Sequence, residues 1–125
     1  MNKKIKRVLV VDDEHMILVS CMQILKMRNY GVDSAYSVKE AKEKLEREYF
    51  HMVISDIELP GETGMDLLRH IKDKHTDTGV ILMTGRLDID SKECINNGAF
   101  DYIQKPFEMQ DFLNKVGKYF EDGKE

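Results

Sequence analysis

Short apolar segments alternate with longer amphipathic segments along the chain. The apolar segments are rich in β-branched and aliphatic residues and are short enough for strands that are buried on both faces of a sheet. They cover 6–11, 32–36, 51–55, 79–84 and 100–104. Between them, apolar residues recur every three or four positions, which predicts helices. These helices cover 14–29, 37 to beyond 45, 63 to about 74, 88–97 and 107–120.

Capping residues mark the ends of these helices. Gly31 and Gly98 stand where a helix stop is expected, because glycine adopts left-handed backbone angles readily. Ser37 with Glu40 has the spacing of a capping box, and Thr63 is expected to cap the third helix. Five strands that alternate with five helices predict an α/β fold, a parallel sheet with helices on both faces.

Composition is that of an ordinary globular domain. With 125 residues, 42% hydrophobic and 34% charged, we expect a single domain over 1–125 with a core from about 5 to 121. No apolar run is long enough to cross a bilayer, and a net charge of −4 with dispersed basic residues argues against direct nucleic-acid binding. Cys21 and Cys94 are far apart and lack metal-ligand spacing, so we expect reduced thiols in a cytoplasmic protein.

Reactive side chains stand at the carboxyl ends of four of the strands. In parallel sheets these ends form the binding crevice. The side chains are those of Asp12 and Asp13, Asp56, Thr84 and Lys105. Three carboxylates at one sheet edge repel one another unless a cation intervenes, and oxygen ligands favour Mg²⁺ (or Mn²⁺). A carboxylate so placed also serves as a nucleophile toward a phosphoryl group, whose oxygens an amine, a hydroxyl and a metal would neutralise.

Four segments, VLVVDDE, SDIELPG with the later Gly64, LMTG and DYIQKPF, resemble the successive signatures of response-regulator receiver domains of two-component and phosphorelay signalling. They occur in the family's order, and the resemblance covers essentially the whole chain. It implies a flavodoxin-like (βα)₅ fold, a doubly wound parallel sheet with strand order 2-1-3-4-5. It also implies a domain that catalyses only its own phosphorylation and dephosphorylation, and is in that sense not an enzyme.

The resemblance further implies roles for the crevice residues. Asp56 matches the phosphoacceptor, which takes its phosphoryl group from a sensor histidine kinase or a phosphotransfer protein. Asp13 matches the direct Mg²⁺ ligand, Asp12 acts largely through water, and the backbone carbonyl of Glu58 supplies a further ligand. Lys105 matches the lysine that pairs with the phosphoryl oxygens, and its bond to the following proline is usually cis in the family.

Two further positions match the family's switch. Thr84 matches the switch hydroxyl, and Tyr102 matches the aromatic that moves from an exposed to a buried rotamer. Their movement would remodel the surface of the fourth helix, fifth strand and fifth helix, where a downstream protein, an output domain or a second copy of the chain would bind. We also hypothesise that Glu58 and Arg86 pair across the mouth of the site and prolong the phosphoryl lifetime.

Other functions remain open at this stage. Glu58, two residues after Asp56, stands where haloacid dehalogenase-like phosphatases carry their general acid/base, so a hydrolase is one alternative. A nucleotide- or flavin-binding module of the same fold is another, although DDEH rather than a glycine-rich loop follows the first strand. A degenerate receiver that serves only protein contacts is a third. The sequence leaves open whether the chain acts alone or is part of a longer regulator.

Overall fold

A single five-stranded sheet is the centre of the computed structural model, which describes residues 5–121. All neighbouring strands are parallel, in the order β2-β1-β3-β4-β5. The strands are β1 (Arg7–Val11), β2 (Gly31–Ala35), β3 (Met52–Asp56), β4 (Gly79–Thr84) and β5 (Asp101–Gln104). The parallel α/β sheet predicted from the sequence and the strand order implied by the resemblance are both confirmed.

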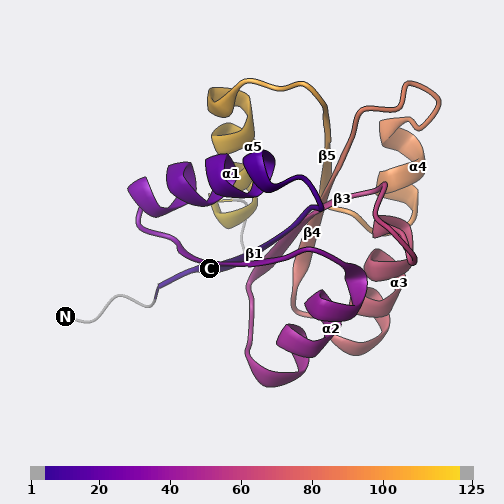
Figure 1. Ribbon diagram of the computed structural model, residues 1–125, viewed down its shortest axis with the longest axis horizontal. Coiled ribbons are helices and arrows are strands. Elements are labelled where there is room, and N and C mark those ends of the chain that lie inside the picture. Colours follow the sequence, from indigo (N-terminus) through magenta and orange to yellow (C-terminus); the bar gives the residue numbers. More distant parts are fainter. Residues whose placement is uncertain (1–4, 122–125) are drawn as a thin grey trace.

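The helices cover both faces of this sheet. They are α1 (His15–Met27), α2 (Val38–Arg47), α3 (Gly64–Lys74), α4 (Ser91–Asn96) and α5 (Met109–Glu121). Helices α1 and α5 lie together on one face, and α2, α3 and α4 lie on the other (Figure 1). Among the described helices, none has both the length and the apolar character needed to span a bilayer.

The sheet divides the apolar residues into two cores. Successive side chains of a strand point to opposite faces, so Leu9 and Val53 pack toward α2 and α3, while Val10 and Ile54 pack toward α1 and α5. Every residue of β3 and β4 is buried, which explains their nearly continuous apolar sequence. The two cysteines are buried, one in each core, and neither forms a disulfide.

Three predicted helix boundaries were wrong by two or three residues, and one of them is the start of α5, which lies at Met109 rather than at residue 107. Helix α1 ends at Met27, and Asn29 takes the left-handed conformation (φ 69°), whereas Gly31 is the first residue of β2. Asparagine substitutes for glycine here because its short polar side chain tolerates positive φ better than most. Helix α4 begins at Ser91 rather than at residue 88.

Side-chain caps define the starts of α2 and α4. Asp90 starts α4, because its carboxylate accepts a hydrogen bond from the Glu93 amide at 2.9 Å. Gly98, with φ 108°, follows the end of α4 as predicted. Ser37 caps α2, but the Glu40 carboxylate bonds the amide of Tyr36 rather than that of Ser37, so the capping box is incomplete.

Candidate functional site

The carboxyl ends of the strands gather the predicted side chains at one edge of the sheet. Asp12 directly follows β1, Asp56 is the last residue of β3, Thr84 is the last residue of β4, and Lys105 directly follows β5. Parallel strands all run the same way, so residues at their carboxyl ends must meet at the same edge.

Three carboxylates form the acidic cluster of Asp12, Asp13 and Asp56. Each offers an oxygen, and these oxygens lie within 4.8 Å of one another. Asp12 is fully buried, Asp56 is 5% exposed, and Asp13 is exposed. A set of hard oxygen donors that is open to solvent on one side fits a divalent cation such as Mg²⁺.

The Lys105 ammonium is directed into this cluster. Its Nζ lies 2.8 Å from an oxygen of Asp12, 3.1 Å from one of Asp56 and 3.2 Å from one of Glu14. Burial opposes the charged form, but the hydrogen bonds to Asp12 and Asp56 hold the pKa of Lys105 above its usual value. The bond from Lys105 to Pro106 is cis.

Of the three carboxylates that bond the Lys105 ammonium among the described residues, Glu14 is the one that sequence analysis did not single out. It is the third acid of the DDE run that follows β1, so the signal was present in the sequence. Its carboxylate is mostly exposed and stands next to Lys105 at the rim of the acidic cluster.

Asp56 combines burial with strong local charges. Burial raises the pKa of Asp56 to about 6, the hydrogen bond and charge of Lys105 oppose this, and the Asp12 charge adds to it. Its Oδ1 accepts a bond from the Glu58 amide at 3.3 Å, and its Oδ2 accepts the bond from Lys105. Hydrogen bonds thus hold both carboxylate oxygens of Asp56, and the side chain lies just below the protein surface.

The hydroxyl of Thr84 is tied to Glu58. Thr84 is fully buried, and its Oγ1 donates to the Glu58 carboxylate at 3.0 Å and accepts from the Arg86 amide at 3.0 Å. The guanidinium of Arg86 lies 3.5 Å from the same Glu58 oxygen, so the pair that the sequence predicted is present. Arg86 bonds the Asp88 carboxylate more closely, at 2.9 Å from its Nε.

Tyr102 is half-buried and packs against the core beneath α4. Its hydroxyl lies 3.0 Å from the carbonyl of Ile89 and 3.0 Å from the side-chain oxygen of Gln104. The ring therefore already contacts the loop between β4 and α4, whereas the resemblance implied an exposed starting position.

The model of the family described as "Response regulator receiver domain" matches residues 8–117 of this chain. The chain belongs to this family. The domain therefore acts in two-component signalling, where receivers accept a phosphoryl group and respond by changing conformation. Membership of this family favours the receiver over the hydrolase and the nucleotide-binding module that the sequence left open.

The similarity extends to individual proteins. The regulatory protein VanR of Enterococcus faecium is 38% identical over 111 residues, which are 88% of this chain and 48% of VanR. The receiver thus spans about half the length of this relative. A receiver domain from Methanospirillum hungatei has a TM-score of 0.88 at 33% identity, with 95% of this chain and 96% of that one covered. A complex of CheX, CheY, BeF₃ and Mg²⁺ from Borrelia burgdorferi contains a chain with a TM-score of 0.85 at 28% identity, with 92% and 89% covered.

Proposed function

We propose that Asp56 accepts a phosphoryl group from a sensor histidine kinase or a phosphotransfer protein. The observation that carries the proposal is the position of Lys105, whose ammonium bridges Asp12 and Asp56 at the edge of the acidic cluster. An Asp56 oxygen attacks phosphorus and forms an acyl phosphate, while the bond from phosphorus to the donor breaks. The Lys105 ammonium is within reach of the new phosphoryl oxygens and offsets their charge.

The acidic cluster is proposed to hold the cation that this reaction needs. Asp12, Asp13 and Asp56 with the backbone carbonyl of Glu58 would bind Mg²⁺ or Mn²⁺, and the related Borrelia CheY is described in complex with BeF₃ and Mg²⁺. When bound, such a cation supplies positive charge to the phosphoryl oxygens. The domain would act catalytically only on itself.

The signal would leave the site through Thr84 and Tyr102. A phosphoryl group on Asp56 offers acceptor oxygens that compete with Glu58 for the Thr84 hydroxyl. When Thr84 turns inward, the space that it leaves would admit the Tyr102 ring, which is bonded to the loop before α4. A change here biases the surface of α4, β5 and α5 between two states.

That surface is the proposed contact for an output domain, a downstream protein or a second copy of the chain. It carries apolar side chains at its edge, since Leu87 is 88% exposed and Ile95 is 44% exposed. Apolar groups that are uncovered in this way favour a protein partner. Size-exclusion chromatography with and without beryllofluoride and Mg²⁺ would show whether activation produces a homodimer.

Glu58 and Arg86 would set the lifetime of the phosphoryl group. Both lie at the mouth of the site and are partly exposed, so their pairing contributes little to stability and would act instead by hindering the attacking water. We further propose that chain 1–125 forms one receiver domain that functions in the cytoplasm, either alone or within a longer regulator.

The decisive experiment compares the wild type with Asp56→Asn. Acetyl phosphate with Mg²⁺ should label the wild type at one site, and the variant should remain unlabelled. Asp73→Asn on the exposed face of α3 is the matched control and should be labelled normally. Undiminished labelling of Asp56→Asn would contradict the assignment, and repeated turnover of a generic phosphate ester would support the hydrolase instead.

A further inference from the structure

A second group of side chains of the kinds that bind metal ions lies between α2 and α3. It consists of Glu46 in the last turn of α2, His70 within α3 and His75 at the carboxyl end of α3. Each offers one ligand atom, and these atoms lie within 4.8 Å of one another. We refer to these three residues as the histidine cluster.

The histidine cluster is remote from the acidic cluster. Glu46 and His75 come shortly before β3 and β4, whereas Asp56 and Thr84 end those strands. Because the strands are parallel, the two groups stand at opposite edges of the sheet. An ion at one would therefore not share ligands with an ion at the other.

The imidazoles of the histidine cluster have unsatisfied nitrogens. The Nε2 atoms of His70 and His75 are both buried, and neither has a hydrogen-bond partner among the described residues. The ring centroids are 5.4 Å apart, with the planes at 53°. A buried polar atom without a partner costs free energy, so two such nitrogens on neighbouring imidazole rings call for a ligand.

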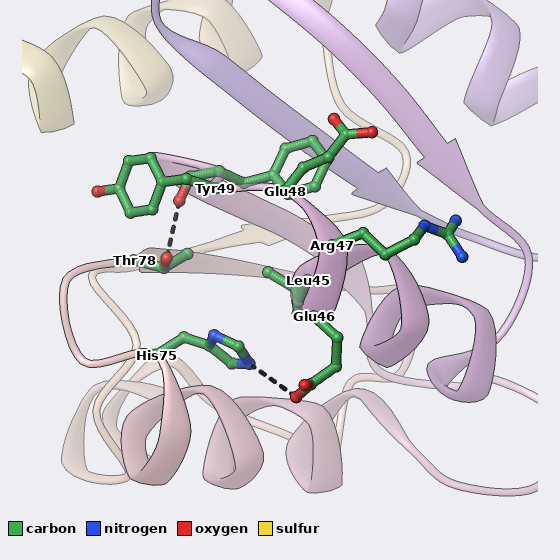
Figure 2. Close-up of a pocket in the computed structure, with 8 residues that line it drawn as sticks. Leu45, Glu46, Arg47, Glu48, Tyr49, His75 and Thr78 are labelled. Atoms are coloured by element: carbon green, nitrogen blue, oxygen red, sulfur yellow. Dashed lines mark hydrogen bonds and ion pairs between the residues drawn. The ribbon is translucent and has the colours of Figure 1, made fainter.

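The carboxylate of Glu46 completes the group. Its Oε2 lies 4.0 Å from the His75 Nε2, and Figure 2 shows the side chain extending from α2 toward the imidazole at the end of α3. At this separation the two groups are not hydrogen-bonded, but the distance suits a small ion between them. The Glu46 side chain is 68% exposed, so it is free to move closer.

The electrostatic surroundings keep His70 in the form that binds metals. Burial first, and then the charges of Lys42 and His75, lower the pKa of His70. The imidazole is therefore neutral at physiological pH, and a metal needs this form because it binds the nitrogen lone pair.

We propose that Glu46, His70 and His75 bind one divalent transition-metal ion of the zinc class. Two imidazoles and one carboxylate are a ligand set for Zn²⁺, whereas Mg²⁺ prefers oxygen ligands alone. In a tetrahedral Zn²⁺ site the ligand atoms are about 3.3 Å apart, which small side-chain rotations reach from the present positions. The ion ties the end of α2 to the end of α3.

A fourth ligand position remains for solvent. Glu46 and His75 line a surface cavity of about 300 Å³ together with Tyr49 and Thr78. The cavity gives the cluster access to water and small anions. The site is therefore an open one with three protein ligands rather than a closed structural site.

Calorimetric titration of the EDTA-treated full chain with Zn²⁺, in an excess of Mg²⁺, tests the proposal. The wild type should bind one equivalent at the histidine cluster, and His70→Ala or His75→Ala should weaken that binding about tenfold or more. Glu46→Gln should weaken it less, and because this side chain is exposed the variant retains the fold. His15→Ala, which removes an exposed histidine from α1, should bind Zn²⁺ as the wild type does.

Asp56→Asn separates this site from the acidic cluster. It should leave the Zn²⁺ affinity of the histidine cluster unchanged. The metal-binding proposal is therefore tested independently of the proposed phosphorylation site. Histidine-ring ¹⁵N spectra give a direct readout, in which Zn²⁺ should shift the His70 and His75 resonances but not that of His15. The proposal would be overturned if the wild type, His75→Ala and Glu46→Gln bound Zn²⁺ with equal affinity. It would also be overturned if saturating Zn²⁺ left the His70 and His75 resonances unshifted.

Discussion

The hydroxyl of Thr84 donates a hydrogen bond to the carboxylate of Glu58 at 3.0 Å. Glu58 follows Asp56 by two residues, so the carboxylate that holds this hydroxyl stands beside the proposed phosphoacceptor. A phosphoryl group on Asp56 would have to replace one acceptor of Thr84 by another. The observed position of Thr84 is thereby stabilised by a bond that the proposed activation would break.

The lifetime of the phosphoryl group should depend on Glu58 and Arg86. The double variant Glu58→Asn with Arg86→Ala removes both charged side chains at the mouth of the site and gives water easier access to phosphorus. We expect the phosphoryl group to hydrolyse severalfold faster, as measured by loss of label after removal of the phosphodonor. An unchanged lifetime would show that the pair has no such role.

Asp88 provides a control for this experiment. Its carboxylate lies closer to the Arg86 guanidinium than the Glu58 carboxylate does. Asp88→Asn should release Arg86 toward Glu58, and the phosphoryl lifetime should stay the same or increase. If Asp88→Asn shortened the phosphoryl lifetime as much as the double variant does, the effect would come from the order of the loop after β4 rather than from shielding of phosphorus from water.

Thr84→Ala should separate phosphorylation from signalling. Asp56 keeps its contacts with Lys105, so labelling persists, but no hydroxyl remains to follow the phosphoryl group. On addition of beryllofluoride and Mg²⁺, the amide resonances of α4 and β5 should shift much less than in the wild type. Thr78→Ala, which removes a buried hydroxyl bonded to the Phe50 carbonyl, is the matched control and should respond fully.

Stability should depend on the protonation of Asp56. Its pKa is about 6 in the folded state and 3.8 in the reference state, so the folded protein binds more protons between these values. The Asp56 carboxyl therefore stabilises the folded state, and this contribution to the free energy of unfolding is fully present below about pH 3.8. The contribution is lost as the pH rises through about 6. At pH 7.5 in EDTA, Asp56→Asn should be more stable than the wild type by about 1–3 kcal/mol.

Chemical denaturation at several pH values measures this effect. The advantage of Asp56→Asn should shrink toward pH 4, where the wild-type carboxyl is protonated in the folded state. Asp73→Asn should show little advantage at any pH. If Asp56→Asn were equally stable with the wild type at pH 7.5 and at pH 4, the ionised carboxylate would carry no such cost.

Gly64 should not tolerate a side chain. A Cβ at this position would lie 2.3 Å from the carbonyl oxygen of Asp56 and 2.8 Å from the Cα of Ile57, and backbone atoms cannot move aside cheaply. Gly64→Ala should cost about 1–3 kcal/mol of stability and slow labelling of Asp56.

Gly85→Ala is the control for Gly64→Ala, because within residues 5–121 its Cβ would meet only the Cβ of Lys105, at an ordinary contact distance of 3.9 Å. Denaturation midpoints and labelling rates of the two variants test the contrast. Similar behaviour of both would show that the close approach at Gly64 does not matter.

The sequence alone determined the α/β class and the places of the strands. The segments that became β3 and β4 are nearly all apolar because they are buried on both faces, and burial of that kind leaves a pattern that can be read directly. The rule for parallel strands was enough to predict that one edge of the sheet carries Asp56, Thr84 and Lys105. Helix ends were less predictable, because local hydrogen bonds and backbone angles determine them. Asn29, rather than Gly31, takes the left-handed conformation after α1. Asp90, rather than Asp88, precedes α4 and caps it.

Only the tertiary structure decided which polar groups bond one another. Lys105 and Asp12 are 93 residues apart, and no periodicity predicts that their atoms lie at 2.8 Å. The bond between Thr84 and Glu58 and the meeting of Glu46 with His75 have the same origin, since each joins separate elements. Hydrophobic pattern fixes which face of an element is buried, whereas side-chain contacts between elements depend on the register and packing of the folded chain.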